Sequence, residues 1–196
     1  MRKIGIVGND ITQSDLIERS KGFDLWSCNN LFAGFPDVTF DRWFELHDFK
    51  RREKQIARRA SDYYPISSEI TVREYMDQIN ALNIPVFMQR KWRAIKKSQV
   101  FPFDAIMAKW GKYFGCSFTW MMAMALDEGV DEIGIFGLNF GMQEYYYQRP
   151  SLEYMIGYAR GTGVKVTIDE ASCQLLKEPY VYAINEDYDL IYMLHG

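Results

Sequence analysis

The sequence predicts an α/β protein, a single domain built on a doubly wound, mostly parallel sheet with helices on both faces. Short apolar segments of strand length alternate with segments of helical pattern, as in parallel sheets whose strands are connected by helices. Residues 117–126 (SFTWMMAMAL) are apolar on almost every helical face, and residues 133–136 (IGIF) follow after one turn. This pair indicates a buried helix next to a central strand covered on both faces. A chain of 196 residues is long enough for one domain with a sizeable core.

The first half of the chain supplies three of the expected strands. They are residues 3–7, 23–28 and 42–46, with a short helix or turn over 11–22. Polar residues follow each strand, namely Gly8-Asn9-Asp10, Asn29-Asn30 and His47-Asp48. A helical, basic insertion is expected around 50–83, in which Thr71 and Glu74 form the capping pattern of a helix over 71–82.

The second half continues the alternation of strands and helices. A strand is expected over 84–89, and the apolar helix that opens at Ser117 ends before Gly129, which tolerates a left-handed conformation. Pro150 predicts the start of a helix over 151–160. A strand over 164–168, a short helix over 169–177 and edge strands or a cover over 180–192 complete the expected elements.

Composition and charge narrow the class of protein. Hydrophobic residues make up 48% and charged residues 25% of the chain, and the net charge is −3, so a globular protein without a general affinity for nucleic acid is expected. Cys28, Cys116 and Cys173 lack metal-type spacing, which favours reduced thiols and a cytoplasmic location. We recognise no signal peptide and no apolar run of membrane-spanning length, and therefore expect no membrane partner.

Two basic clusters stand out against this acidic background. Residues 50–59 carry six basic residues and one acid, and residues 90–97 carry Arg90, Lys91, Arg93, Lys96 and Lys97. A solvated helix face explains such a cluster in most proteins. The competing interpretation is that the clusters meet on one face and receive a phosphorylated acceptor, nucleic acid included.

The candidate site lies where the expected strands end, because ligands of open α/β sheets bind beyond the carboxyl ends of the strands. Gly8, Asn9, Asn29 and Asn30 could contact a nucleotide there, although an asparagine turn explains Asn29-Asn30 equally well. His47 followed by Asp48 could supply acid–base chemistry or be a structural histidine. A dense polar and aromatic cluster follows the central strand, consisting of Asn139, Gln143, Glu144, Tyr145, Tyr146, Tyr147, Gln148 and Arg149.

About half of the chain resembles a known family. The matching pieces are residues 7–9 (VGN), 23–29 (FDLWSCN) and Cys116-Ser117 with the Met/Ala-rich helix that leads to 132–140 (EIGIFGLNF). They are similar to the bacterial CMP-sialic-acid-dependent sialyltransferases. The same Rossmann-like fold family includes motility-associated flagellin glycosyltransferases, hydroxymethylpterin diphosphokinase-like proteins and a group of phage-encoded proteins. A phage origin would place the chain in the cytoplasm of a host cell.

The resemblance implies roles for individual residues. It implies that Asn9 lies at the phosphate, that Asn29 contacts a nucleotide sugar of CMP or UDP type, and that Ser117 lies beside the nucleotide at a helix N-terminus. It also implies that Asn139 lies near the ribose or base and that Tyr145, with Tyr147 as a substitute, hydrogen-bonds the leaving phosphate. Neutral donors and a helix end can stabilise that phosphate without a metal ion.

The chain departs from this family at two places. The family's Gly-Pro-Ser continuation of the first loop is Asp10-Ile11-Thr12 here, and no histidine precedes the helix expected at Ser151. His47 or Glu144 could instead act as the base, and Glu153 is a further candidate.

These observations lead to one expected function and two alternatives. We expect a metal-independent transferase with a nucleotide-activated donor and no covalent cofactor, a glycosyltransferase acting on a glycan, a small molecule or a modified DNA base. The alternatives are a non-catalytic nucleotide-binding or sequestering protein, and an ATP-dependent pyrophosphokinase-like enzyme with Mg²⁺ held by Asp10 and Asp48. A homo-oligomer is compatible with each.

Overall fold

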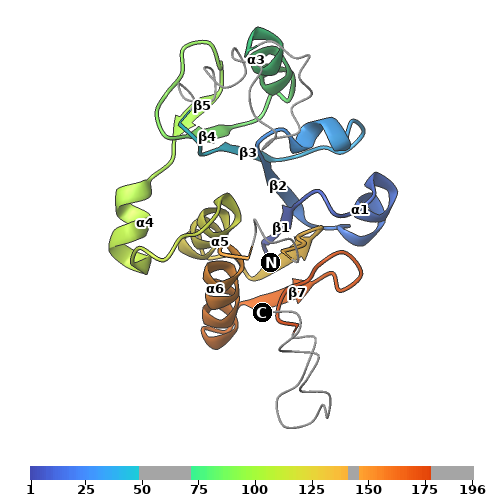
Figure 1. The fold of residues 1–196 in the computed structure, drawn as a ribbon, viewed down its shortest axis with the longest axis vertical. Helices are drawn as coiled ribbons and strands as arrows, with labels where there is room; N and C mark the ends of the chain where they lie inside the picture. The colour runs from blue at the N-terminus through green and yellow to red at the C-terminus, as the bar shows by residue number, and fades with distance from the viewer. Residues whose placement is uncertain (49–71, 141–145, 178–196) are drawn as a thin grey trace, which may run out of the picture.

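Seven parallel strands form one sheet in the part of the chain that the structure describes (Figure 1). The structure is a computed structural model of the 196 residues and describes residues 1–48, 72–140 and 146–177. The strand order is β5–β4–β3–β2–β1–β6–β7, and every neighbouring pair is parallel. The strands are β1 (Lys3–Val7), β2 (Asp24–Cys28), β3 (Arg42–Glu45), β4 (Val86–Met88), β5 (Ser98–Val100), β6 (Glu132–Phe136) and β7 (Lys165–Ile168). The predicted doubly wound α/β class is confirmed.

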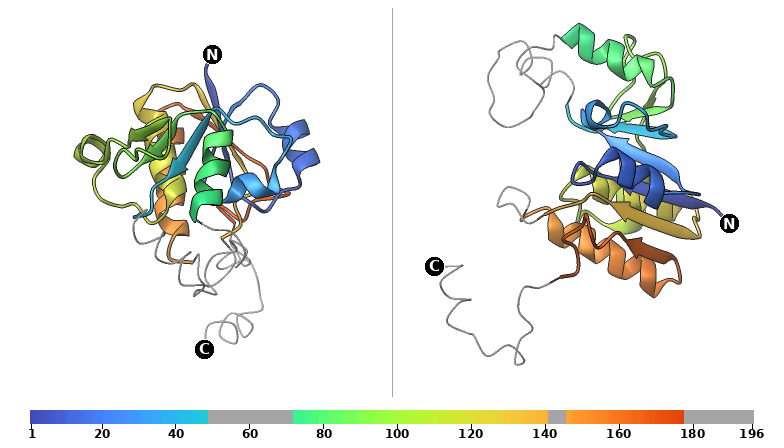
Figure 2. Two further views of the ribbon diagram at one scale, coloured as in Figure 1. Left: turned by 90° about the horizontal axis from the view of Figure 1, so that it is seen from above. Right: turned by 90° about the vertical axis from the view of Figure 1, so that its right-hand side faces the viewer.

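Helices cover both faces of this sheet (Figure 2). They are α1 (Gln13–Arg19), the 3₁₀ turn η1 (Leu31–Gly34), α3 (Val72–Ala81), α4 (Phe103–Trp110), α5 (Ser117–Asp127) and α6 (Arg149–Gly161). Leu16 of α1 and Tyr75 of α3 belong to the hydrophobic cluster on one face. Met121 of α5 and Leu152 of α6 belong to the cluster on the other face. The core therefore consists of two apolar layers separated by the sheet.

The strand order reverses at β1, an interior strand of the sheet between β2 and β6. From β1 the chain adds β2 to β5 on one side, and it then returns to add β6 and β7 on the other. Ile6 of β1 pairs with Trp26 of β2 and with Ile135 of β6. The connection after β1 leads to one side of the sheet, and the connection after β6 leads to the other. Open α/β sheets bind ligands in the crevice between two such connections, which here lies at the carboxyl ends of β1 and β6.

Local sequence signals explain several element boundaries. Thr12 caps α1, because its hydroxyl oxygen accepts a hydrogen bond from the Asp15 amide at 3.2 Å. The α5 helix ends as predicted before Gly129, which has a φ of 68°. Pro150 lies in the first turn of α6, where a missing amide hydrogen costs nothing.

Four elements differ from the prediction. The strand β5, the helix α4 and the 3₁₀ turn η1 were not predicted, because all three are short. The predicted helix over 169–177 is wrong: these residues form turns and irregular structure. Ser172 and Cys173 use their side chains to hydrogen-bond the backbone of Gly137 and Leu138, which fixes this segment as a loop.

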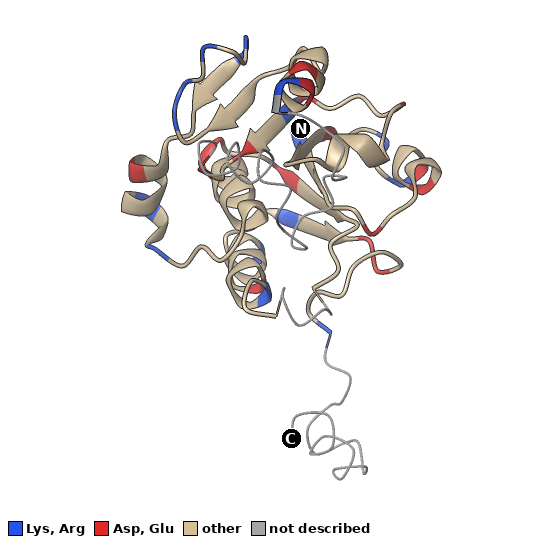
Figure 3. Cartoon of the chain, turned by 45° about the horizontal axis from the view of Figure 1, so that its top comes forward, with Lys and Arg blue, Asp and Glu red and all other residues tan. Residues whose placement is uncertain are grey.

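Several sequence predictions fall outside the described residues. They concern the basic segment 50–59, the cap at Thr71, the residues Glu144 and Tyr145, and the cover expected over 180–192. The basic residues of 90–97 are described and lie in the loop that joins β4 to β5, drawn with blue segments in Figure 3.

Candidate functional site

A cavity of about 200 Å³ opens at the carboxyl ends of β1, β2, β3 and β6. It is smaller than the roughly 300–1,000 Å³ typical of pockets for drug-sized ligands. Its lining consists of Asn9, Asn29, Asn30, Leu31, His47, Gly115, Cys116, Ser117, Phe118, Gly137, Leu138, Asn139, Phe140 and Gln148. Six of the ten predicted site residues, from five separate segments, therefore meet in one place: Asn9, Asn29, Asn30, His47, Ser117 and Asn139.

The loop after β1 is interlocked with the turn after β6. The Gly8 amide donates to Phe136 O at 2.8 Å, and the Asp10 amide donates to Gly137 O at 3.0 Å. A Cβ atom on Gly8 would overlap the Gly137 carbonyl oxygen and the Leu138 side chain. Gly8 is not among the lining residues, but it allows the two loops to approach closely, and the next residue, Asn9, lines the cavity.

Asn29 has a left-handed backbone with a φ of 59°. Its amide donates to Phe44 O at 3.0 Å, and its carbonyl oxygen accepts from Trp43 Nε1 at 3.0 Å. Its side-chain oxygen Oδ1 is buried and has no hydrogen-bond partner among the described residues. Asparagine tolerates this backbone better than most residues, and a buried amide without a partner costs free energy that a ligand donor could recover.

The amino end of α5 forms a second wall of the cavity. Residues 115–118 line it in succession, and Ser117 is the first residue of the helix. The first-turn amides of a helix have no acceptor within the helix and carry partial positive charge. Gln148, which precedes α6, also lines the cavity, so two helices begin at this site.

Hydroxyl groups connect these two helix starts. Thr119 Oγ1 lies 3.0 Å from Ser151 Oγ, and the Gly115 amide donates to the same Ser151 oxygen at 2.9 Å. Cys116 Sγ lies 3.2 Å from Thr119 Oγ1. Burial raises the pKa of the Cys116 thiol, and its hydrogen bond with Thr119 offsets this only in part. Cys116 is therefore a neutral thiol in the wall rather than a nucleophilic thiolate.

His47 is the only histidine among the described residues that line the cavity. Its Nδ1 lies 3.2 Å from Oε1 of Glu45, a residue with 0% exposure at the end of β3. The Tyr75 hydroxyl from α3 donates to the other carboxylate oxygen, Oε2. The sequence analysis did not single out Glu45; an acidic residue inside the apolar strand RWFEL, two positions before a histidine, was the available signal.

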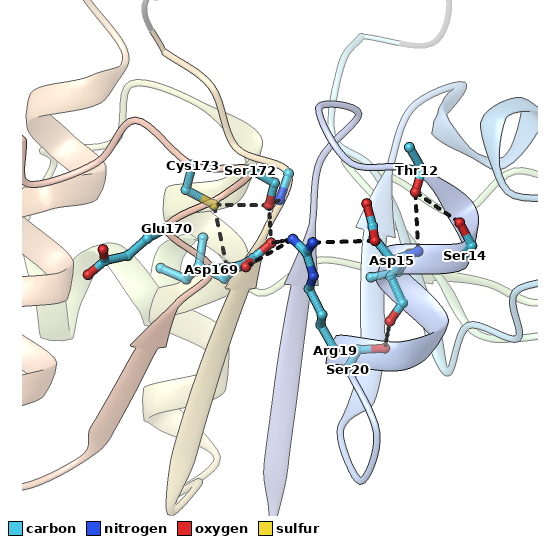
Figure 4. A network of polar contacts seen from close by, with 12 residues as sticks. Thr12, Ser14, Asp15, Arg19, Ser20, Asp169, Glu170, Ser172 and Cys173 are labelled. Atoms are coloured by element: carbon cyan, nitrogen blue, oxygen red, sulfur yellow. Dashed lines mark hydrogen bonds and ion pairs between the residues drawn. The ribbon is translucent and has the colours of Figure 1, made fainter.

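The loop that follows β7 hydrogen-bonds the turn after β6, and Figure 4 shows the polar contacts of its residues Asp169, Ser172 and Cys173. The Gly137 amide donates to Ser172 Oγ at 2.9 Å, and Ser172 Oγ donates to Asp169 Oδ2 at 2.5 Å. Arg19 of α1 approaches the same carboxylate, with Nη1 3.0 Å from Oδ2. The hydrogen bond to Asp169 raises the pKa of the Arg19 guanidinium. This series of contacts, which runs from Arg19 through Asp169 and Ser172 to Gly137, fixes one wall of the cavity.

Two further candidates that the structure describes, Tyr147 and Glu153, do not line the cavity. Tyr147 is 84% exposed and does not line it. Glu153 forms an ion pair with Arg149 at 2.7 Å and accepts from the Leu176 amide. Glu144 and Tyr145 lie outside the described residues. Gln148, a member of the predicted polar and aromatic cluster, does line the cavity, whereas Cys116 and the apolar Leu31 and Phe118 are lining residues that the sequence analysis did not select.

The described lining of the cavity contains no acidic side chain, lysine or arginine, and the carboxylates of Asp10 and Asp48 lie outside it. The lining residues include amides, hydroxyls, one thiol and one imidazole, but no carboxylate, lysine or arginine among the described part of the chain. Asp10 accepts from Asn139 Nδ2 at 2.8 Å, and Asp48 lies 3.6 Å from Arg90. The two carboxylates named for the Mg²⁺-dependent alternative therefore contact other side chains and lie outside the described lining.

Comparisons with protein-family models, curated proteins and solved structures returned no match for this chain. The fold and the cavity define a Rossmann-like α/β protein with a neutral, polar cavity at the reversal of its strand order. Among the described helices, none combines the length and the apolar character needed to cross a membrane.

Proposed function

We propose that the chain binds a nucleotide in this cavity and is a metal-independent transferase that uses a nucleotide-activated donor, with glycosyl transfer as its reaction. One observation carries the proposal: Asn9, Asn29 and Ser117 come from three distant segments and line the same cavity at the carboxyl edge of the sheet. The resemblance to the sialyltransferases implies nucleotide contacts for each of these three residues. Their convergence supports that implication.

The cavity offers neutral groups suited to a departing phosphate. The start of α5 presents backbone amides and the Ser117 hydroxyl, and the side-chain amide of Asn9 adds a further donor. Oriented donors in a site that excludes water stabilise developing negative charge without a metal ion. The absence of carboxylates from the described lining is consistent with this mode, because a lining carboxylate would repel a phosphate.

His47 is the residue of the described lining whose side chain can serve as a general base. In the proposed step, an acceptor hydroxyl loses its proton to His47 as its oxygen attacks the anomeric carbon. The bond between that carbon and the donor phosphate breaks, and the nucleotide leaves with the electron pair. The donor, the acceptor and one imidazole thus account for the bond that forms, the bond that breaks and the proton that is transferred.

A second function is favoured by a specific observation. Asp10 carries a carboxylate 2.8 Å from the Asn139 amide, at the edge of the proposed phosphate site. This carboxylate replaces a neutral residue of the family that the sequence resembles, and it opposes the binding of a highly charged donor. A protein that retains a nucleotide without turnover is therefore the second candidate.

Thermal-shift and native mass-spectrometry screening of CMP, UDP, GDP and adenine nucleotides tests both candidates. The proposal expects at least one nucleotide to stabilise the protein and Asn29→Ala to abolish that shift. Gln78→Ala, an exposed amide on α3, is the matched control and should bind like the natural chain. Release of free nucleotide from the corresponding nucleotide sugar supports the transferase; tight binding without release supports the second candidate. A panel without any stabilising nucleotide contradicts both.

A further inference from the structure

A buried carboxylate lies directly behind the histidine of the cavity. Glu45 is 0% exposed, and its two oxygens have different partners: Oε1 lies 3.2 Å from His47 Nδ1, and Oε2 accepts from the Tyr75 hydroxyl. Tyr75 is itself 0% exposed in the apolar layer under α3. Burial of a carboxylate is costly unless it is hydrogen-bonded, and here both oxygens are.

The end of β3 brings these residues close together. Glu45 is the last residue of the strand, and His47 follows two positions later in the bend after it. Glu45 lies inside the apolar layer, whereas His47 is 36% exposed and lines the cavity. The contact therefore joins a carboxylate of the protein interior to an imidazole that lines the cavity.

We propose that Glu45 is a positioning residue that holds His47 as the Nδ1–H tautomer and leaves Nε2 as the proton acceptor for the cavity. A carboxylate accepts hydrogen bonds but donates none when ionised, so the nitrogen that faces it must carry the hydrogen. The catalytic part of this inference rests on the proposed transferase function; the tautomer does not.

The arrangement has a direct chemical consequence. When Nε2 takes a proton from an acceptor hydroxyl, the ring becomes an imidazolium that remains hydrogen-bonded to an anionic carboxylate. The carboxylate stabilises that charge without taking the proton, as in hydrolases that pair histidine with a buried acid. The hydroxyl of Tyr75 keeps the carboxylate in place while the imidazole changes charge.

Long-range ¹H–¹⁵N spectra of the imidazole rings test the tautomer, because protonated and unprotonated ring nitrogens differ in ¹⁵N shift. The chain has two histidines, so a His195→Gln variant assigns the signals of His47. In the natural chain, above the pH at which the ring is charged, we expect Nδ1 to be protonated and Nε2 to be unprotonated. A spectrum with the hydrogen on Nε2 overturns the proposal without any variant.

Two variants form a matched pair. Tyr75→Phe removes a hydroxyl but retains the carboxylate, so the Nδ1–H tautomer should persist. Glu45→Met combined with Tyr75→Phe replaces the buried polar pair by apolar groups of similar size, a change that folded proteins often accept. The double variant should show both tautomers, and a retained Nδ1–H tautomer there contradicts the proposal.

Turnover separates this inference from the function on which it rests. If the natural chain turns over a nucleotide sugar, the double variant should lose about 10²-fold or more of that rate while Tyr75→Phe loses less than about tenfold. Nucleotide affinity should stay within about threefold in both variants, because neither residue lines the cavity. Equal rates in the two variants contradict the positioning role. A natural chain without turnover contradicts the transferase, and the tautomer then still decides the role of Glu45.

Discussion

Asn139 Nδ2 donates a hydrogen bond of 2.8 Å to Asp10 Oδ2 and so connects the loops that follow β6 and β1. The bond spans the reversal of the strand order, where Asn139 lines the cavity. It holds one negative charge at the margin of an otherwise neutral lining. The charge of Asp10 should therefore decide how strongly an anionic ligand binds.

Asp10→Asn should strengthen nucleotide binding. The change removes a carboxylate that repels a phosphate, while an amide oxygen can still accept from Asn139. A gain of roughly fivefold in affinity, or about 1 kcal/mol, is expected for one charge near a partly exposed site. Calorimetric titration measures the effect, which should shrink at high salt. Asp24→Asn, at the opposite end of β2, is the control; an unchanged affinity in Asp10→Asn would argue against a phosphate near this loop.

Ser117→Asp should separate helix stability from ligand binding. An acidic residue at the first position of α5 favours the helix by roughly 0.3–1 kcal/mol through the helix dipole. The same charge should repel a phosphate and lower nucleotide affinity by about tenfold or more. Thermal unfolding and titration measure the two effects in one preparation. Ser117→Ala serves as the neutral control, and tight nucleotide binding by the aspartate variant would place the phosphate elsewhere.

Ser172→Ala should destabilise the protein and loosen one wall of the cavity. The buried Gly137 amide loses its acceptor, and Asp169 loses a donor. An unsatisfied buried amide costs about 1–3 kcal/mol, which denaturant unfolding can measure. Ser14→Ala, an exposed serine on α1, should change stability by less than about 0.5 kcal/mol. Equal stabilities of the two variants would show that the loop after β7 does not support Gly137.

Glu132→Gln should remove a pH dependence of stability in acid. Glu132 is 3% exposed, and Lys3 and Lys165 each lie 2.9 Å from its carboxylate. The hydrogen bond from Lys165, with the one from Lys3, lowers the pKa of Glu132 to about 2, against the opposing effect of burial. Because the folded pKa lies below the unfolded one, this contribution is full above about pH 4.5 and is lost as pH falls toward 2.

The size of the contribution is on the order of 2 kcal/mol. Unfolding free energies of the natural chain and of Glu132→Gln, measured between pH 2 and pH 6, give the comparison. The difference between the two proteins should narrow toward pH 2. A constant difference over the whole range would mean that Glu132 has an ordinary pKa in the folded state.

Much of the fold could be predicted from local patterns. The apolar run that begins at Ser117 and the short strand at Ile133 have the length and composition of buried elements, and glycine or proline marks their ends. Residues 98–100 and 103–110 were not predicted, because a strand of three residues and a helix of eight residues each give only a short local pattern. Residues 169–177 contain helix formers, yet Ser172 and Cys173 bond to a distant turn instead.

The candidate site, like the fold, could be predicted from the sequence only in part. Asn9, Asn29, Asn30 and His47 could be selected because each follows an apolar strand segment, and in a parallel sheet all carboxyl ends lie at one edge. Glu45 could not be assigned a role, because its importance depends on Tyr75, which a helix far along the chain brings to it. Gln148 became a lining residue only through the approach of α6 to α5.

The alternation of strands and helices, the parallel sheet and the polar strand ends can be derived from the sequence, since they depend on composition and period within short segments. Three features emerge only from the folded chain: which strand ends are neighbours, the contact of Glu45 with His47, and the support of Gly137 by Ser172. The physical reason is that a hydrogen bond between distant segments depends on their placement in space, and residue order encodes that placement only through the packing of the whole chain.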